Sequence, residues 1–100
     1  MELEVTGPSE ILIRGNIKSI ENYRDIKKAV EGLVQRGAGN ITIDILESLS
    51  MTSSVIGFFV KLVSRDNVKV NMHVHDRRLY ETLGELKLID IFGVHFSGKP

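Results

Sequence analysis

Short segments of alternating apolar and polar side chains are interleaved with longer segments of helical period, and this pattern constrains the fold more than any other feature. Residues 41–45 and 68–74 alternate, which is the period of a half-buried strand. Residues 20–34 carry apolar side chains at steps of three and four, as an amphipathic helix does. Ser19 is the predicted N-cap of that helix, and Gly37 is predicted to close it. Strands separated by helices predict some parallel pairing within one sheet.

The same patterns extend to both sides of this central part. Residues 2–6 and 11–13 are predicted as two short strands that form a hairpin. Thr52 or Ser53 is predicted to cap a second helix, which carries apolar side chains on one side. Asp76 is predicted to cap a third helix.

The end of the third helix and the last strand complete the expected order. Gly84 is predicted to end the third helix, and Ile89, Ile91 and Val94 are predicted to form the last strand. The expected fold is therefore α/β, with a mixed sheet of four to five strands packed against three helices in the order β-β-α-β-α-β-α-β. Its length predicts one domain, residues 1–100.

Composition excludes several classes of function. Lysine and arginine number 13, against 13 acidic residues, so no overall charge favours nucleic acid or a membrane surface. There is no cysteine, which excludes disulfides and thiolate chemistry. No apolar run reaches the ~20 residues of a transmembrane helix, and the acidic N-terminus lacks a signal-peptide pattern. We expect a cytoplasmic protein. It carries no phosphate-binding loop, dinucleotide fingerprint or nucleophile–base pair, which predicts that it is not an enzyme.

The segment from Asp44 to Gly57 is the most informative for function. An apolar strand ends near a carboxylate, a polar loop follows, and Ser53 and Ser54 then open a helix. Backbone N–H groups at a helix N-terminus are free to bind an anion. The residues alone leave three uses open for these hydroxyls: a helix cap, a phosphate-binding residue or a phosphorylation site.

This order of elements, with that loop in its middle, resembles the STAS domain, and among its members the bacterial anti-sigma-factor antagonists. Their loop reads Asp-Ser-Ser-Gly-Leu-Gly, and residues 52–57 stand in its place after Asp44 and Ile45. Residues 68–75 and 77–83 are also similar to the strand and helix that follow in the family. The resemblance covers the chain from Leu3 to about Phe92.

The resemblance implies a signal-transduction role in transcription regulation. In the antagonists, a serine kinase that is also the anti-sigma factor phosphorylates the serine after the loop Asp, and a phosphatase resets it. By position that serine is Ser53. Thr52 and Ser54 would shape the loop, and Gly57 would allow close approach of the partner to the helix. The module itself would need no cofactor, because the kinase supplies ATP and magnesium.

Three residues depart from the family pattern. The loop Asp is Thr52 here, and the Gly after the serines is Val55. After the second predicted strand, the turn reads Gly-Asn-Ile-Lys, so Asn16 and Lys18 occupy a partner-facing segment that is usually acidic at its last position. These changes keep a second hypothesis open, in which the chain is a constitutive STAS subunit of a larger complex and is never phosphorylated.

A third hypothesis is a receiver-like phosphotransfer domain using Asp44, although the acidic pair that receivers carry after the first strand is missing. Phe58, Lys61 and Arg65 on the second helix are predicted to flank the Ser53 loop as part of a partner surface. Three histidines lie on or near the last two strands, but without cysteine we expect no metal site. They are His73, His75 and His95.

Overall fold

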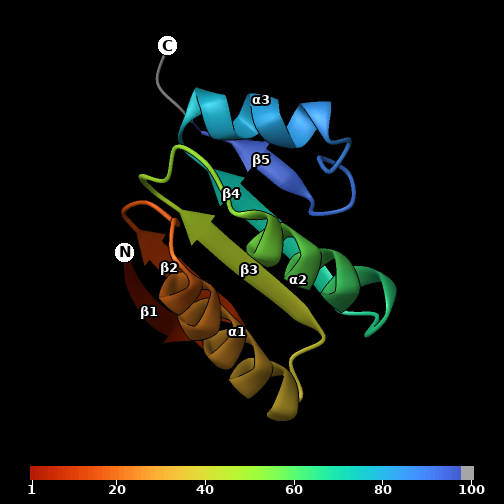
Figure 1. Ribbon diagram of the computed structural model, residues 1–100. Coiled ribbons are helices and arrows are strands. Elements are labelled where there is room, and N and C mark those ends of the chain that lie inside the picture. The colour runs from red at the N-terminus through yellow and green to blue at the C-terminus, as the bar shows by residue number, and fades with distance from the viewer. Residues whose placement is uncertain (98–100) are drawn as a thin grey trace.

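A mixed sheet with the strand order β1-β2-β3-β4-β5 forms the centre of the computed structural model, which describes residues 1–97 (Figure 1). β1 and β2 pair antiparallel, and each later neighbour is parallel to the one before it. The strands are β1 (Glu2–Gly7), β2 (Glu10–Arg14), β3 (Asn40–Ile45), β4 (Lys69–Val74) and β5 (Val94–Phe96), and the helices are α1 (Ile20–Gln35), α2 (Ser53–Ser64) and α3 (Arg77–Glu85). The predicted fold class and element order are confirmed.

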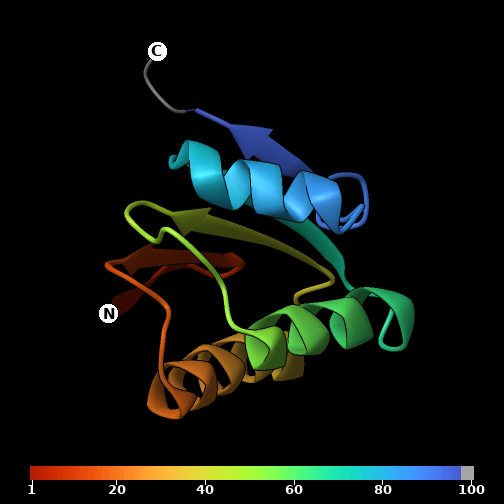
Figure 2. The ribbon, with the colours of Figure 1, turned by 45° about the horizontal axis from the view of Figure 1, so that its top comes forward.

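All three helices lie on the same face of the sheet (Figures 1 and 2). On that face the alternating side chains of the central strands are buried, for example Ile41, Ile43 and Ile45 of β3. The helices contribute Phe59 of α2 and Leu79 of α3 to the same core. Because successive side chains of a strand point to opposite faces, the polar residues between these isoleucines lie on the other face.

Local signals explain where the helices begin. The Ser19 hydroxyl accepts from the Asn22 amide, while the Asn22 side chain accepts from the Ser19 amide, which forms a capping box. Gly37 follows α1 with a φ of +99°, a conformation that glycine adopts without strain. The predictions of Ser19, Thr52 and Asp76 as N-caps are confirmed.

The prediction for the C-terminal part was wrong in two places. Ile89 and Ile91 lie in turns rather than in a strand, and β5 starts only at Val94. Gly93, within the predicted strand, has a φ of +54°, which an extended strand does not accommodate. Gly93 is required there because a Cβ would lie 2.7 Å from the Val70 carbonyl oxygen.

The predicted end of α3 and the predicted burial of one residue of α1 also need correction. Gly84 lies inside the last turn of α3 and does not end it, because Lys87 takes the left-handed position that was expected of a glycine. Ile20 does not belong to the buried stripe of α1, since it is the first residue of the helix and 63% exposed. Within residues 1–97, no helix combines the length and the apolar character needed to cross a bilayer.

Candidate functional site

The loop that joins β3 to α2, residues 46–52, is fixed to the loop that follows β2. Ser48 is buried, and its hydroxyl accepts from the Ile17 amide at 3.0 Å and donates to the Ser50 carbonyl oxygen. The Asn16 side chain accepts from the Leu49 amide at 3.0 Å. The bonds to the Ile17 amide and to the Asn16 side chain join residues 31 and 33 positions apart. The loop therefore presents the start of α2 from a defined position.

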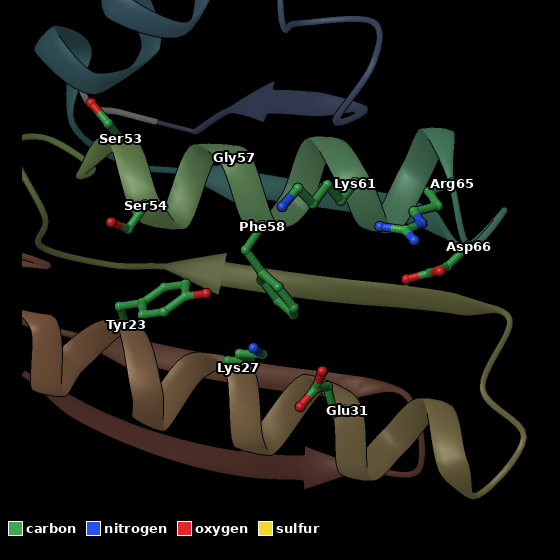
Figure 3. A pocket seen from close by; sticks show the side chains of 10 residues that line it. All are labelled: Tyr23, Lys27, Glu31, Ser53, Ser54, Gly57, Phe58, Lys61, Arg65 and Asp66. Carbon is green, nitrogen blue, oxygen red and sulfur yellow. The ribbon is translucent and has the colours of Figure 1, made fainter.

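At the start of α2, Thr52 serves as the N-cap, and the hydroxyls of Ser53 and Ser54 take no part in capping. The Thr52 hydroxyl accepts from the Val55 amide at 3.3 Å, which satisfies one of the free N–H groups of the first turn. Ser53 and Ser54 are both exposed, and neither hydroxyl bonds to another residue in the described part of the chain. Figure 3 shows the Ser54 hydroxyl on the side of α2 that faces α1, and the Ser53 hydroxyl pointing away from α1.

α1 and α2 lie side by side, and a groove of about 610 Å³ runs between them (Figures 1 and 3). We call it the α1/α2 groove. Its walls come from one side of each helix and from the turn after α2. The lining residues are Tyr23, Lys27, Glu31, Ser53, Ser54, Gly57, Phe58, Lys61, Arg65 and Asp66. The two serines therefore open onto the same surface as four residues predicted as part of a partner site.

Aromatic side chains form the apolar part of this groove. Phe58 is half-buried and lies edge-on to the Tyr23 ring, with ring centroids 6.4 Å apart and an interplanar angle of 83°. Its neighbour Phe59 is fully buried and packs on Phe92 in the core. The helix thus divides its two adjacent rings between the core and the groove.

The charges in the groove are unpaired within the described residues. Lys27, Lys61 and Arg65 are the cations, and Glu31 and Asp66 are the carboxylates. Within residues 1–97 none of these five groups forms an ion pair, and the ion pairs that do form lie elsewhere on the molecule. The Lys27 ammonium lies 5.9 Å from the Tyr23 ring centroid, in reach of a cation–π interaction.

Asp44 and the histidines lie apart from this groove. Asp44 alternates with the buried residues of β3 and so lies on the face of the sheet opposite the helices. Its Oδ1 is 2.8 Å from His75 Nε2, which is its hydrogen-bond partner. His73 and His95 are neighbours on paired strands, with stacked rings 5.3 Å apart. Across residues 1–97, no three side chains of the metal-binding types gather into a site.

The structure thus brings together Ser53, Ser54, Gly57, Phe58 and Lys61 in one groove, with Thr52 capping the helix beneath them. It places Asp44 on the opposite face of the sheet. Asn16 holds the loop through Leu49. Lys18 is exposed and donates its backbone N–H to the Asn22 side chain.

Two parts of the site were missed at the level of sequence. Tyr23 and Lys27 line the groove from α1, and neither was among the residues predicted for the site. Ser48 supports the loop but is one of four serines between positions 48 and 54, and nothing in the sequence distinguishes the buried one from the exposed ones. The apolar period of α1 identifies the side that packs inward, but not which of its edges meets α2.

Comparison of the chain with protein-family models, with curated proteins and with solved structures gave no match.

Proposed function

We propose that this chain is a non-catalytic protein-binding regulatory module of the STAS type, similar to an anti-sigma-factor antagonist. It docks on a serine kinase of the anti-sigma type through the start of α2. Phosphorylation of Ser53 by that kinase releases it, and a phosphatase restores binding. The module acts in the cytoplasm, and its own residues hold no cofactor.

The observation that carries this proposal is the exposed, unbonded hydroxyl of Ser53 at the first position of a capped helix. Because Thr52 already supplies the cap, modification of Ser53 removes no hydrogen bond that the fold uses. A phosphate adds nearly two negative charges at pH 7, and the positive end of the helix dipole tolerates them. A partner packed over the groove would not tolerate them, because the phosphate would have to be desolvated against it.

The alternative of a constitutive subunit rests on a different observation. Val55 is fully buried where the antagonists have a glycine, and Thr52 is engaged as a cap where they have an aspartate. In a permanently bound subunit, the two residues that depart from the family pattern would serve packing and capping, and neither would be needed for regulation. In that case Ser53 has no regulatory role, and binding is independent of ATP.

Use of Asp44 as a receiver-type phosphoacceptor has less support. A receiver holds magnesium with additional carboxylates, and Asp44 has His75 as its partner on the face opposite the groove. Acid-labile phosphate on Asp44, in place of stable phosphate on serine, would be the observation that favours this hypothesis.

The first test is to map phosphate on the protein recovered from its native cells, before and after the extract is incubated with ATP. Stable phosphate on Ser53 supports the proposal, and its absence under both conditions favours the constitutive subunit. Phosphate on Thr52 or Ser54 would retain the switch and move its site. Ser53→Asp should then lose the partner that Ser53→Ala retains, with Ser54→Ala as the matched control. Equal binding of the Asp and Ala variants would exclude the switch.

A further inference from the structure

The α2 wall of the α1/α2 groove carries two cations that form no ion pair with any of residues 1–97. Lys61 and Arg65 are four positions apart, so they are neighbours on the helix surface and repel each other. Both are exposed, and neither forms an ion pair with another residue of the described chain. Carboxylates arriving from outside would relieve this repulsion and fit the pair.

The floor of the groove has room for an incoming side chain at Gly57. A Cβ built there meets no atom within 4 Å, so packing inside the molecule does not require glycine at this position. Glycine is among the least favourable residues in the middle of a helix. Phe58 and Tyr23 lie beside this open point and offer apolar surface. The groove therefore combines an apolar floor with a basic edge on α2, and Glu31 of α1 and Asp66 after α2 are the carboxylates that line it.

We propose that the α1/α2 groove binds an acidic amphipathic helix of the partner protein. Apolar side chains of that helix would rest on Phe58 and Tyr23 over Gly57, and its carboxylates would face Lys61 and Arg65. This inference rests on the proposed function, because it describes the partner that the module binds.

The walls of the groove explain why a helix, and not an extended peptide, is the expected occupant. Both walls are helices, whose backbone hydrogen bonds are internal, so they offer no free sheet edge to an extended peptide. A bound segment must satisfy its own backbone groups, as a helix does. From Ser54 to Arg65 the groove follows α2 for about 16 Å, which matches about three turns of a helix.

The position of the serines connects this inference to the switch. Ser53 and Ser54 line one end of the groove, and Lys61 and Arg65 lie further along the same helix (Figure 3). A phosphate on Ser53 would add negative charge at one end of the groove and would repel the nearest carboxylates of an acidic helix. Lys61 lies about 12 Å further along the axis of α2, so the phosphate would act by this repulsion and not by pairing with the cations.

The test is photocrosslinking in the native cells with p-benzoylphenylalanine in place of Phe58, in the full chain, followed by sequencing of the crosslinked peptide. The expected peptide has aspartate or glutamate along one helical face and apolar residues on the other. Its yield should fall at least about tenfold when Lys61→Glu and Arg65→Glu are combined. A crosslink to a second copy of this chain, a peptide without the acidic amphipathic pattern or a yield unaffected by charge reversal would overturn the inference.

A matched pair of glycines separates blocking of the groove from general damage. Gly57→Leu fills the floor and should lower the yield by about the same factor, whereas Gly32→Leu changes a helical glycine of α1 outside the groove and should not. Equal effects of the two would contradict the inference.

The failure of the inference and that of the proposed function are distinguishable. Crosslinks from the same photoreactive residue at position 54, but none from position 58, would support docking at the start of α2 and would exclude the α1/α2 groove as the binding site. Crosslinks from position 58 that persist in a Ser53→Asp background would support binding in the α1/α2 groove and would exclude regulation by phosphorylation of Ser53.

Discussion

The N-termini of α2 and α3 are similar in backbone structure but are capped differently. Each helix follows a parallel strand, and each has an N-cap residue in an extended conformation. At α3, Asp76 accepts from the amides of Arg78 and Leu79 and contacts the Arg78 guanidinium. At α2, Thr52 accepts a single amide, and the first turn contains no acidic residue.

The connections that lead into the two helices also differ, in length. Only His75 and Asp76 separate β4 from α3, whereas residues 46–52 separate β3 from α2. Before α3, the connection is short, and its charged N-cap accepts two of the free N–H groups of the first turn. A longer one with a neutral cap and two exposed hydroxyls leaves the dipole available to an added charge. Of the two helices, α2 is therefore the one whose first turn leaves room for an added negative charge, as the proposed switch requires.

The largest effect is expected where the longer loop is anchored. Ser48→Ala leaves the buried Ile17 amide and the Ser50 carbonyl without their partner, which should cost about 1–3 kcal/mol of unfolding free energy. Urea unfolding measures it. Ser50→Ala removes an exposed hydroxyl from the same loop and should stay within about 0.5 kcal/mol. Equal effects would mean that the loop is not held through Ser48.

The two caps themselves give the next effect. Asp76→Ala should destabilise the protein by about 1–2 kcal/mol and Thr52→Ala by about 0.5–1 kcal/mol, since Asp76 satisfies two amides and Thr52 one. Asp76→Asn, which retains a capping oxygen, should cost less than Asp76→Ala. Urea unfolding of the three variants ranks them, and a larger loss for Thr52→Ala than for Asp76→Ala would reverse the comparison.

The pH dependence sharpens the contrast between a charged and a neutral cap. Burial opposes ionisation of Asp76, but hydrogen bonds from the Leu79 and Arg78 amides and from the Arg78 side chain outweigh it and lower the pKa of Asp76 below its ordinary value. A lowered pKa in the folded state means that the carboxylate stabilises the fold above its unfolded pKa. This contribution is lost as the pH falls through the folded pKa.

The stability difference between the original protein and Asp76→Ala should therefore shrink when the pH is lowered below about 4. The corresponding difference for Thr52→Ala should stay constant, because a hydroxyl does not titrate there. Urea titrations at several pH values measure both differences. A difference for Asp76→Ala that does not change between neutral and acidic pH would contradict the assigned role of the carboxylate.

The contrast between the two helix starts was only partly available from sequence. Both N-caps and the strand order follow from local signals, since a capping side chain acts within three residues and alternation sets each buried face. The role of Ser48 does not follow from local signals, because its hydrogen-bond partner Ile17 lies 31 positions away. Tyr23 joins the groove only because α1 packs beside α2, a contact that neither helix encodes alone. The end of α3 was misplaced because Lys87, unlike glycine, gives no sign that it will adopt a left-handed conformation.

The smallest effect is the most direct comparison of the two helix starts. Ser53 and Arg77 are the first residues of their helices, so Ser53→Asp and Arg77→Asp add the same carboxylate at equivalent positions. Ser53→Asp should raise the unfolding free energy by about 0.3–1 kcal/mol at low salt, because the first turn of α2 holds no other anion.

Arg77→Asp should instead lower the unfolding free energy, because it places a second carboxylate beside Asp76 and removes the pairing of Arg77 with Glu81. Both changes should diminish in about 1 M salt, where surface charges are screened. Urea unfolding at the two salt concentrations gives the signs. Opposite signs mean that α2 accepts an added charge that α3 cannot, which a phosphate on Ser53 requires. If both variants are destabilised to the same extent, the two helix starts are electrostatically equivalent, and a phosphate on Ser53 would weaken the fold as well as the interface.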